Sequence, residues 1–203
     1  MNIKINTHSS IQINDIAFDP YGITEPSFTA KYVCLTHTHY DHLDINSIKN
    51  IATEKTIIIA PFDAKETLEQ NFDNKIIYVK PNEVLSFEDF SLETFASYNI
   101  NKPFHPKTNN WVGYKLVKNN QTYAVVGDTD ATPELEALTN INALFLPIGG
   151  TYTMTALEAA ELANKIKPKL VIPMHYGSIV GSKADETEFI KHLNKDIEYK
   201  ILL

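Results

Sequence analysis

The chain has 203 residues, of which 43% are hydrophobic and 21% charged, and this composition is typical of a soluble globular protein with a single domain over residues 1–203. The net charge is −7 and no cluster of Lys and Arg stands out, which weighs against a nucleic-acid partner. No apolar run approaches membrane-spanning length, and the first ten residues lack the pattern of a signal peptide. We therefore expect a cytoplasmic protein with no membrane partner.

The first third of the chain predicts a sheet. Apolar residues alternate between residues 3 and 18, which indicates short antiparallel strands that end in a turn at residues 19–22. The apolar run at residues 32–35 predicts a short buried strand. Its single Cys34 excludes an internal disulfide and is predicted to be a small buried hydrophobe.

Three imidazoles and a carboxylate follow that strand within six residues: His37, His39, Asp41 and His42. In extended backbone, side chains two apart point the same way, so the first three share one side of the chain. Asp44 is placed to cap a following helix. Converging imidazoles and a carboxylate are what a borderline divalent cation such as zinc prefers, whereas a lone histidine in a polar loop usually faces water. The pattern predicts a metal site.

The rest of the chain alternates strands with helices. Pro61 is expected to open a short helix, and the irregular stretch at residues 98–110 has the length of a functional loop. The predicted strands are 56–60, 75–79, 83–97 (as antiparallel sheet), 111–117, 121–126, 143–148, 170–172 and 197–203, and the predicted helices are 61–70, a short one from 132, 156–167 and 184–193. This order predicts an α/β or α+β fold with two sheets and helices outside.

The pattern His-x-His-x-Asp-His after a strand resembles the signature of the metallo-β-lactamase superfamily of metal-dependent hydrolases. The chain is most similar to small stand-alone members with a Pro-Ile-Gly-Gly, helix, Pro-Met-His pattern, here residues 147–150 and 173–175. That group includes relatives similar to sugar-phosphate lactonases, such as the L-ascorbate-6-phosphate lactonase, and to phosphodiesterases. The resemblance implies an αβ/βα four-layer sandwich, with two mixed β-sheets flanked by helices.

The resemblance also implies a two-metal site. Asp128 and His175 each follow a predicted buried strand, where the family has a bridging carboxylate and a last histidine. The implied ligands are His37 and His39 for the first ion, Asp41, His42 and His175 for the second, and Asp128 as the bridge. His8 stands near a place where small members often carry a histidine, but a turn histidine bonded to backbone is an equal interpretation, so we leave it out of this set.

The sequence departs from the family at the third histidine. After the strand that ends near Ser97 it has Asn99, and the nearest histidine is His105. Either the Asn99 amide oxygen is a weak ligand, or His105 loops back, or the first site lacks one donor. An amide oxygen is harder than imidazole, so the first site would bind zinc less tightly or favour a harder ion. We expect one or two Zn²⁺ ions, with Mn²⁺ or Fe²⁺ as alternatives.

The implied function is hydrolysis of an ester, lactone or phosphoester bond in a small molecule by a metal-bound hydroxide. Asp41 and Asp128 are the candidate catalytic residues, and Asp41 is also placed to take a proton from the water. Thr151, Tyr152 and Tyr176 lie beside the candidate loops as hydrogen-bond donors for a substrate, although tyrosines near strand ends more often serve packing. The alternatives are a phosphodiesterase or nuclease, and a metal-binding module without catalysis; a homo-oligomer stays open.

Overall fold

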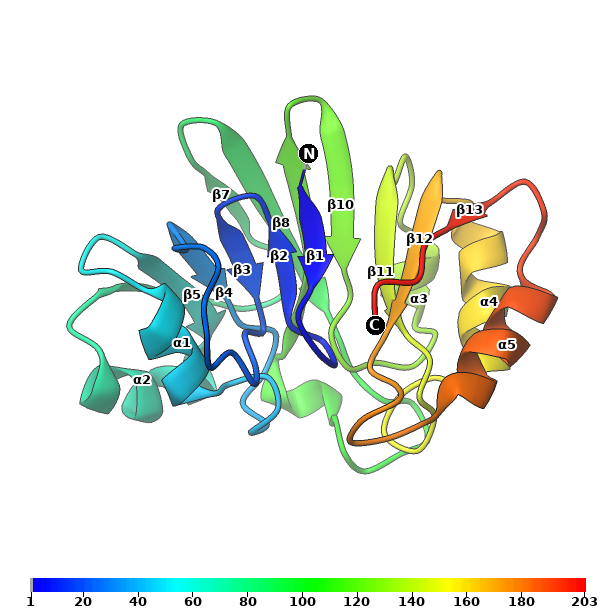
Figure 1. Ribbon diagram of the computed structural model, residues 1–203, viewed down its shortest axis with the longest axis horizontal. Coiled ribbons are helices and arrows are strands. Elements are labelled where there is room, and N and C mark those ends of the chain that lie inside the picture. The colour runs from blue at the N-terminus through cyan, green and yellow to red at the C-terminus, as the bar shows by residue number, and fades with distance from the viewer. Residues whose placement is uncertain (1) are drawn as a thin grey trace. The chain divides into compact units, whose positions relative to one another are not determined.

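The computed structural model describes residues 2–203, and the chain divides into two compact units. One unit spans residues 2–79 together with Leu203, and the other spans Lys80–Leu202. Each unit contains one mixed β-sheet with helices packed on it (Figure 1). The prediction of two mixed sheets flanked by helices is therefore confirmed, while the single domain over residues 1–203 stays a prediction.

The first unit is built on a six-stranded sheet with the order β1-β2-β3-β4-β5-β6. Neighbours pair antiparallel from β1 to β3 and parallel from β3 to β6. Its elements are β1 Ile3–Ile5, β2 Ile11–Ile13, β3 Ile16–Phe18, β4 Tyr32–Cys34, α1 Ile45–Ile51, β5 Ile57–Pro61, the 3-10 turn Phe62–Ala64, α2 Lys65–Asn71 and β6 Lys75–Val79.

The core of this unit joins the two helices to the middle of the sheet. Ile48 and Ile51 of α1 and Leu68 of α2 belong to one buried cluster with Val33 of β4 and Ile58 of β5. Ile48 and Ile51 lie three residues apart on one face of α1, whereas α2 contributes the single buried residue Leu68. This packing holds the β4–α1 segment at both of its ends.

Cys34 is fully buried at the end of β4, as predicted. Burial raises the pKa of its thiol well above the usual range, and the nearby Asp19 carboxylate raises it further. A thiol held in its neutral form is a poor nucleophile, so Cys34 acts as a small core residue.

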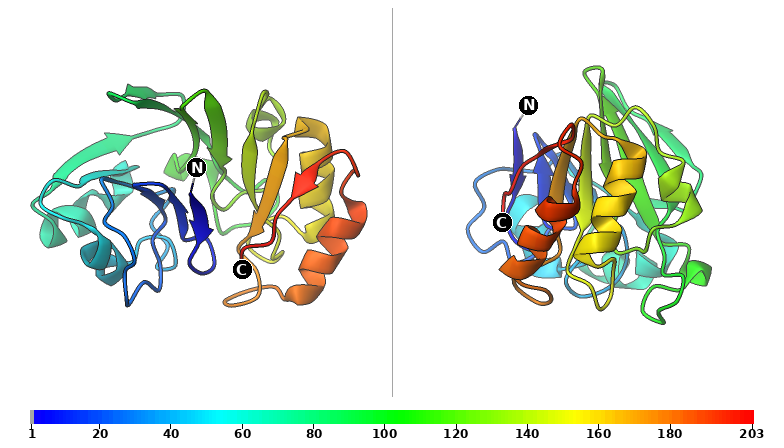
Figure 2. Two further views of the ribbon diagram at one scale, coloured as in Figure 1. Left: turned by 45° about the horizontal axis from the view of Figure 1, so that its top comes forward. Right: turned by 90° about the vertical axis from the view of Figure 1, so that its right-hand side faces the viewer.

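The second unit is built on a seven-stranded sheet with the order β13-β12-β11-β10-β9-β8-β7. Pairing is antiparallel from β7 to β10 and parallel from β10 to β13. Helix α4 contacts β11 and also packs on α5, as the yellow and orange helices of Figure 2 show. The elements are β7 Val84–Ser86, β8 Phe90–Ala96, the 3-10 turn Lys107–Asn109, β9 Val112–Lys118, β10 Gln121–Val125, α3 Pro133–Glu136, β11 Ala143–Pro147, α4 Ala156–Ile166, β12 Leu170–Met174, α5 Lys183–His192 and β13 Glu198–Tyr199.

Two predicted elements differ from the observed ones. Pro61 was expected to open a helix, but it ends β5, where it pairs with Val79, and a 3-10 turn precedes α2. The last strand was expected over residues 197–203, but only Glu198–Tyr199 pair with β12. Among the described residues, no helix combines the length and apolar character that crossing a membrane requires.

Strand direction decides where the loops of each unit gather. In the first sheet β1, β3, β4 and β5 run the same way, because two antiparallel steps separate β1 from β3 and the later pairs are parallel. In the second sheet β8, β10, β11 and β12 share one direction for the same reason. The carboxyl ends of each set therefore meet at one edge of their sheet, which is the edge where open α/β sheets bind ligands.

The pairing of β8 with β9 yields a test of the fold. A Cβ atom added at Gly113 would lie 2.2 Å from Cε2 of Phe95, which is directly opposite in the register. Because Phe95 is buried, we expect Gly113→Ala to lower the free energy of unfolding by about 1–3 kcal/mol through overpacking, measured by urea denaturation. The control Val117→Ala, at an exposed position of the same strand, should cost less than about 1 kcal/mol. Equal losses for the two variants would contradict the packing of Phe95 over Gly113.

Candidate metal centre

Two histidines of the first unit face each other in the loop that follows β4. Nε2 of His37 lies 3.1 Å from Nδ1 of His39. Two nitrogens bound about 2.0–2.1 Å from one tetrahedral zinc ion lie roughly 3.3 Å apart. The observed spacing is that of a hydrogen bond between the two rings, and it is also close to the spacing of two ligands of one ion.

Asp19 and Thr36 orient the imidazoles of this loop. The backbone amide and the hydroxyl of Thr36 both donate to the Asp19 carboxylate at 2.7 Å, and Nδ1 of His42 lies 2.8 Å from the same carboxylate. The Thr36 hydroxyl, whose proton goes to Asp19, accepts from Nδ1 of His37 at 2.9 Å. Both histidines therefore carry their proton on Nδ1, which leaves Nε2 as the basic nitrogen.

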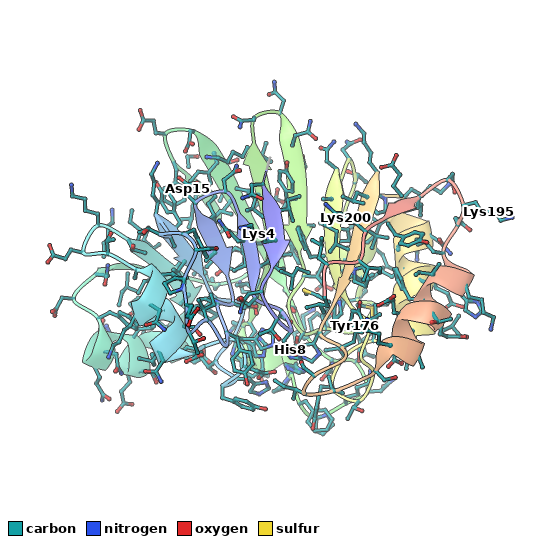
Figure 3. The ribbon with its side chains drawn as sticks, in the orientation of Figure 1. Lys4, His8, Asp15, Tyr176, Lys195 and Lys200 are labelled. Atoms are coloured by element: carbon teal, nitrogen blue, oxygen red, sulfur yellow. The ribbon has the colours of Figure 1, made fainter. Side chains whose placement is uncertain are left out.

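His8 joins the same cluster, although it lies 33 residues before its partner. It is fully buried, and its Nε2 lies 3.0 Å from Oδ2 of Asp41. Nε2 of His42 lies 3.6 Å from the same oxygen, and the three residues each offer a ligand atom within 4.8 Å of the others. Figure 3 shows His8 at the end of the blue strands away from Asp15, where β1 ends.

The backbone at His8 is held in an unusual conformation. His8 has a φ of +53°, and the amide of Ser10 donates to the carbonyl of Thr7 to close the turn around it. A left-handed backbone at a residue other than glycine costs energy and recurs at functional sites. The turn points the imidazole toward Asp41 at that cost.

Asp44 closes the loop by capping α1, as predicted. Its carboxylate accepts from the amides of Asn46 and Ser47, and from the Ser47 hydroxyl at 2.6 Å. It also accepts from the amide of Gly22 at 3.2 Å, which ties the turn after β3 to the helix. Burial by itself raises the pKa of Asp44, but the hydrogen bonds from Ser47, Gly22 and Asn46 outweigh it and hold the pKa below its ordinary value.

The second unit carries its own cluster on the loops that follow β8, β10 and β12. Oδ2 of Asp128 lies 2.9 Å from Nε2 of His175 and 3.4 Å from Nε2 of His105. All three side chains are buried. The ring of Trp111 contacts that of His105 edge to face, with 5.6 Å between the ring centroids. Two imidazoles thus converge on one carboxylate oxygen.

Asn99 and His105 are joined by three hydrogen bonds across the loop between β8 and β9. The amide of Asn99 donates to the carbonyl of His105 at 2.7 Å, and the amide of His105 donates back to Oδ1 of Asn99 at 3.1 Å. Nδ1 of His105 lies 3.0 Å from the same Oδ1, while Nδ2 of Asn99 donates to the carbonyl of Tyr152. The Asn99 oxygen therefore serves His105, whose proton is on Nδ1 and whose Nε2 is turned toward Asp128.

The three candidate donors of the second unit differ in their surroundings. Tyr176 is buried, and its hydroxyl donates to Glu186 of α5 at 2.9 Å (Figure 3 labels Tyr176). Burial raises the pKa of Tyr176, and the contact with Glu186 raises it further, so this tyrosine packs and does not present its proton. Thr151 and Tyr152 are exposed at the turn after β11.

Six of the seven histidines of the chain belong to these two clusters. In the first unit the structure brings together His37, His39, Asp41 and His42, and in the second it brings together Asp128, His175 and His105. Sequence reasoning missed Asp19, which read as part of a turn, and left His8 out. The sequence signal for both was their place within three residues after an alternating apolar strand. The assignment of metal ligands itself stays a prediction.

The donor set suits a borderline divalent cation. Imidazole nitrogens and carboxylate oxygens dominate both clusters, and thiolates and backbone carbonyls do not contribute. Nδ1 of His37, His42 and His105 each lies within hydrogen-bond distance of an oxygen acceptor, as in metal-binding histidines generally. The residues present therefore fit a zinc-type ion, and the chemistry of the donors alone does not select which one.

A model of the beta-lactamase superfamily domain matches residues 3–175 of the chain. The chain belongs to this superfamily. The matched segment contains the His-x-His-x-Asp-His pattern, Asp128 and His175, so the family assignment rests on the same loops as the two clusters.

The relatives carry names that agree with the family. A UPF0173 metal-dependent hydrolase from Nanoarchaeum equitans is 32% identical, and the alignment covers 93% of this chain and 90% of the relative. A solved structure from Parabacteroides distasonis, described as that of a metal-dependent hydrolase, is 27% identical with a TM-score of 0.85, covering 98% of this chain and 91% of the other. The metallo hydrolase Igni18 from Ignicoccus hospitalis shares the fold at 18% identity, with a TM-score of 0.75 over 98% of this chain and 93% of the other.

The Asp44 cap yields a test of how the loop is held. Asp44→Ala should lower the free energy of unfolding by about 1 kcal/mol at pH 7, measured by denaturant unfolding. Because the folded-state pKa is lowered, the carboxylate's contribution is complete above the unfolded pKa of about 3.9 and is lost as the pH falls through the folded value. The difference between wild type and variant should shrink in that acid range. Glu54→Ala, at an exposed position after α1, is the control and should cost less than about 0.5 kcal/mol at either pH.

Proposed function

We propose that this protein is a metal-dependent hydrolase that cleaves a small-molecule ester, lactone or phosphoester bond. The observation that carries the proposal is a cluster of buried or half-buried histidines with a carboxylate in each unit of a member of the beta-lactamase superfamily. In each unit the cluster stands on loops after strands that run in one direction within their sheet. The net charge of −7 favours a small substrate over nucleic acid. The cytoplasmic location stays a prediction.

The proposed ligand set follows the family pattern. His37 and His39 would hold one ion, Asp128 would bridge, and the second ion would take the ligands Asp41, His42 and His175. Zinc is the first candidate, with one or two ions bound, and the grounds for this assignment are the donor types and the resemblance to the family. A second ion is the finer part of the proposal.

We assign the place of the missing third histidine to His105 and an orienting role to Asn99. The support is that Asn99 already directs its oxygen to the backbone amide and to Nδ1 of His105. An oxygen that accepts both bonds is poorly placed to serve a cation as well. His105 then offers Nε2, on the side of Asp128.

Held by these residues, such an ion would lower the pKa of a water to about 7 and would polarise the substrate oxygen. The chain's own residues orient the groups around it. His8 donates to Asp41 and fixes the rotation of that carboxylate, which is the candidate to accept a proton at its oxygen during hydrolysis. Asp19 holds His42 through Nδ1, so the ring cannot turn away. Burial of these side chains keeps bulk water from competing for the donors.

The first test removes one ligand from each cluster. His37→Ala and Asp128→Ala should each lower metal content, measured by elemental analysis of the purified protein. Each should also lower the chelator-sensitive hydrolysis of p-nitrophenyl esters, lactones and phosphodiesters at least about a hundredfold. His192→Ala is the matched control, because His192 is a half-buried residue of α5 whose ring pairs with Glu188, outside both clusters.

Two results would change the proposal. Bound metal without turnover on any of these substrates would favour a binding module instead of an enzyme. Turnover that survives both chelation and the double change His37→Ala, Asp128→Ala would remove metal-dependent hydrolysis altogether.

The second test separates His105 from Asn99. We expect His105→Ala to lose one ion, or to bind it so weakly that a mild chelator removes it. Asn99→Ala should retain the ion with an affinity about 10–100-fold lower, because only the orientation of the ligand is lost. Competition against a chromophoric chelator measures both affinities. Normal metal binding by His105→Ala together with metal loss in Asn99→Ala would show that the amide oxygen is the ligand.

A further inference from the structure

The second unit exposes two aromatic rings beside its cluster. Phe104 directly precedes His105, and its ring contacts that of Tyr152 edge to face, with 4.8 Å between the centroids. Phe104 is 39% exposed and Tyr152 is 36% exposed. Two contacting rings that are each more than a third exposed, next to a cluster of polar side chains, form an apolar face that a ligand can cover.

The position of this pair is fixed from two sides. The Asn99 side chain accepts from His105 and donates to the carbonyl of Tyr152 at 3.0 Å, so one amide connects both ring-bearing segments. On the other side, a Cβ atom at Gly149 would lie 2.2 Å from the carbonyl oxygen of His175. The turn that carries Tyr152 therefore contacts the backbone of His175 where it leaves β11. Its Tyr152 carbonyl is also hydrogen-bonded to Asn99, the partner of His105.

The backbone before Tyr152 carries strain. The amide of Thr153 donates to the carbonyl of Gly150 at 3.0 Å and closes a turn in which Thr151 has a φ of +46°. A β-branched residue is seldom found in this left-handed region, where glycine is preferred. Strain of this kind persists where the surrounding structure demands a particular placement, here that of Tyr152.

The lysines of the loop that carries Phe104 are already paired with carboxylates. The two lysines of the loop are Lys102, which pairs with Asp130, and Lys107, which pairs with Glu134 at 2.7 Å. An anionic substrate group beside the rings, such as a phosphodiester, would have to compete with these carboxylates for the two lysines. A neutral apolar group does not compete for these lysines, and it would bury the apolar surface of the rings.

We propose that Phe104 and Tyr152 form a specificity wall that selects neutral ester or lactone substrates with a planar apolar group on the carbon beside the acyl carbon. This inference rests on the proposed hydrolase function and narrows its substrate class. In the reaction, water adds its hydroxyl to the acyl carbon, the acyl C–O bond breaks, and the departing oxygen takes the proton. The wall holds the apolar group and takes no part in proton transfer.

The experiment compares ligands that differ only by a phenyl ring. Methyl phenylacetate and methyl acetate measure kcat/KM, and the neutral amides phenylacetamide and acetamide measure binding by calorimetry without turnover, on metal-loaded and metal-free protein. The wild type should prefer the phenyl compound in both assays by about tenfold or more. Bis(p-nitrophenyl) phosphate, an anion with aromatic rings, should be the poorer substrate.

The variants locate that preference. Phe104→Ala and Tyr152→Ala should each reduce the ratio between phenyl and methyl compounds about tenfold. Tyr152→Phe should keep it, because the ring and not the hydroxyl forms the wall. The matched control is Tyr199→Ala, which removes an exposed tyrosine on β13 opposite Val171, away from the strand end that carries His175.

Three outcomes would overturn the inference while leaving the hydrolase proposal intact. The first is equal binding of phenylacetamide and acetamide by the wild type. The second is a preference unchanged by both alanine variants alongside chelator-sensitive turnover, and the third is a preferred phosphodiester substrate. Failure of the hydrolase proposal is seen separately, as absent metal or as turnover that chelators do not affect.

Discussion

The candidate site depends on buried imidazoles whose Nδ1 protons are taken by oxygen atoms. Thr36 accepts from His37, Asp19 accepts from His42, and Asn99 accepts from His105. A buried imidazole that lost this partner would leave a polar atom unsatisfied, at a cost of about 1–3 kcal/mol, and its ring could turn. With the partner in place, each ring has one tautomer and one orientation, and Nε2 keeps its lone pair.

The acceptors come from strand ends that sheet topology brings to the same edge. Asp19 follows β3 and Thr36 follows β4, and the parallel register of these strands pairs Phe18, one residue before Asp19, with Cys34, two residues before Thr36. In the second unit Ser97 after β8 donates to the carbonyl of Val126 after β10 at 2.7 Å. Two strands of the same direction thus tie their terminal loops together, and loops tied in this way can hold side chains to within the tolerance that ligation requires.

Sequence alone predicted the parts of the site that are contiguous or that follow a recognisable strand. His37, His39, Asp41 and His42 stand within six residues, so local geometry sufficed. Asp19 could not be assigned from the sequence, because its role is to accept hydrogen bonds from Thr36 and His42, which are 17 and 23 residues away. An Asp-Pro pair is also typical of a turn. The choice between Asn99 and His105 was also open, because an irregular loop has no period from which the directions of its side chains follow.

The chemistry of position 99 explains why an amide stands where the family has a histidine. The side chain there must accept from the amide and from Nδ1 of His105 and must also donate to the carbonyl of Tyr152. A carboxylate would accept but could not donate, and it would add a charge beside Asp128; a hydroxyl could donate only once and is too short to span both segments. Asparagine meets all three requirements without charge. The same side chain therefore sets the ring of His105 and the turn of Tyr152, so the residue that orients a ligand also fixes the wall proposed to select the substrate.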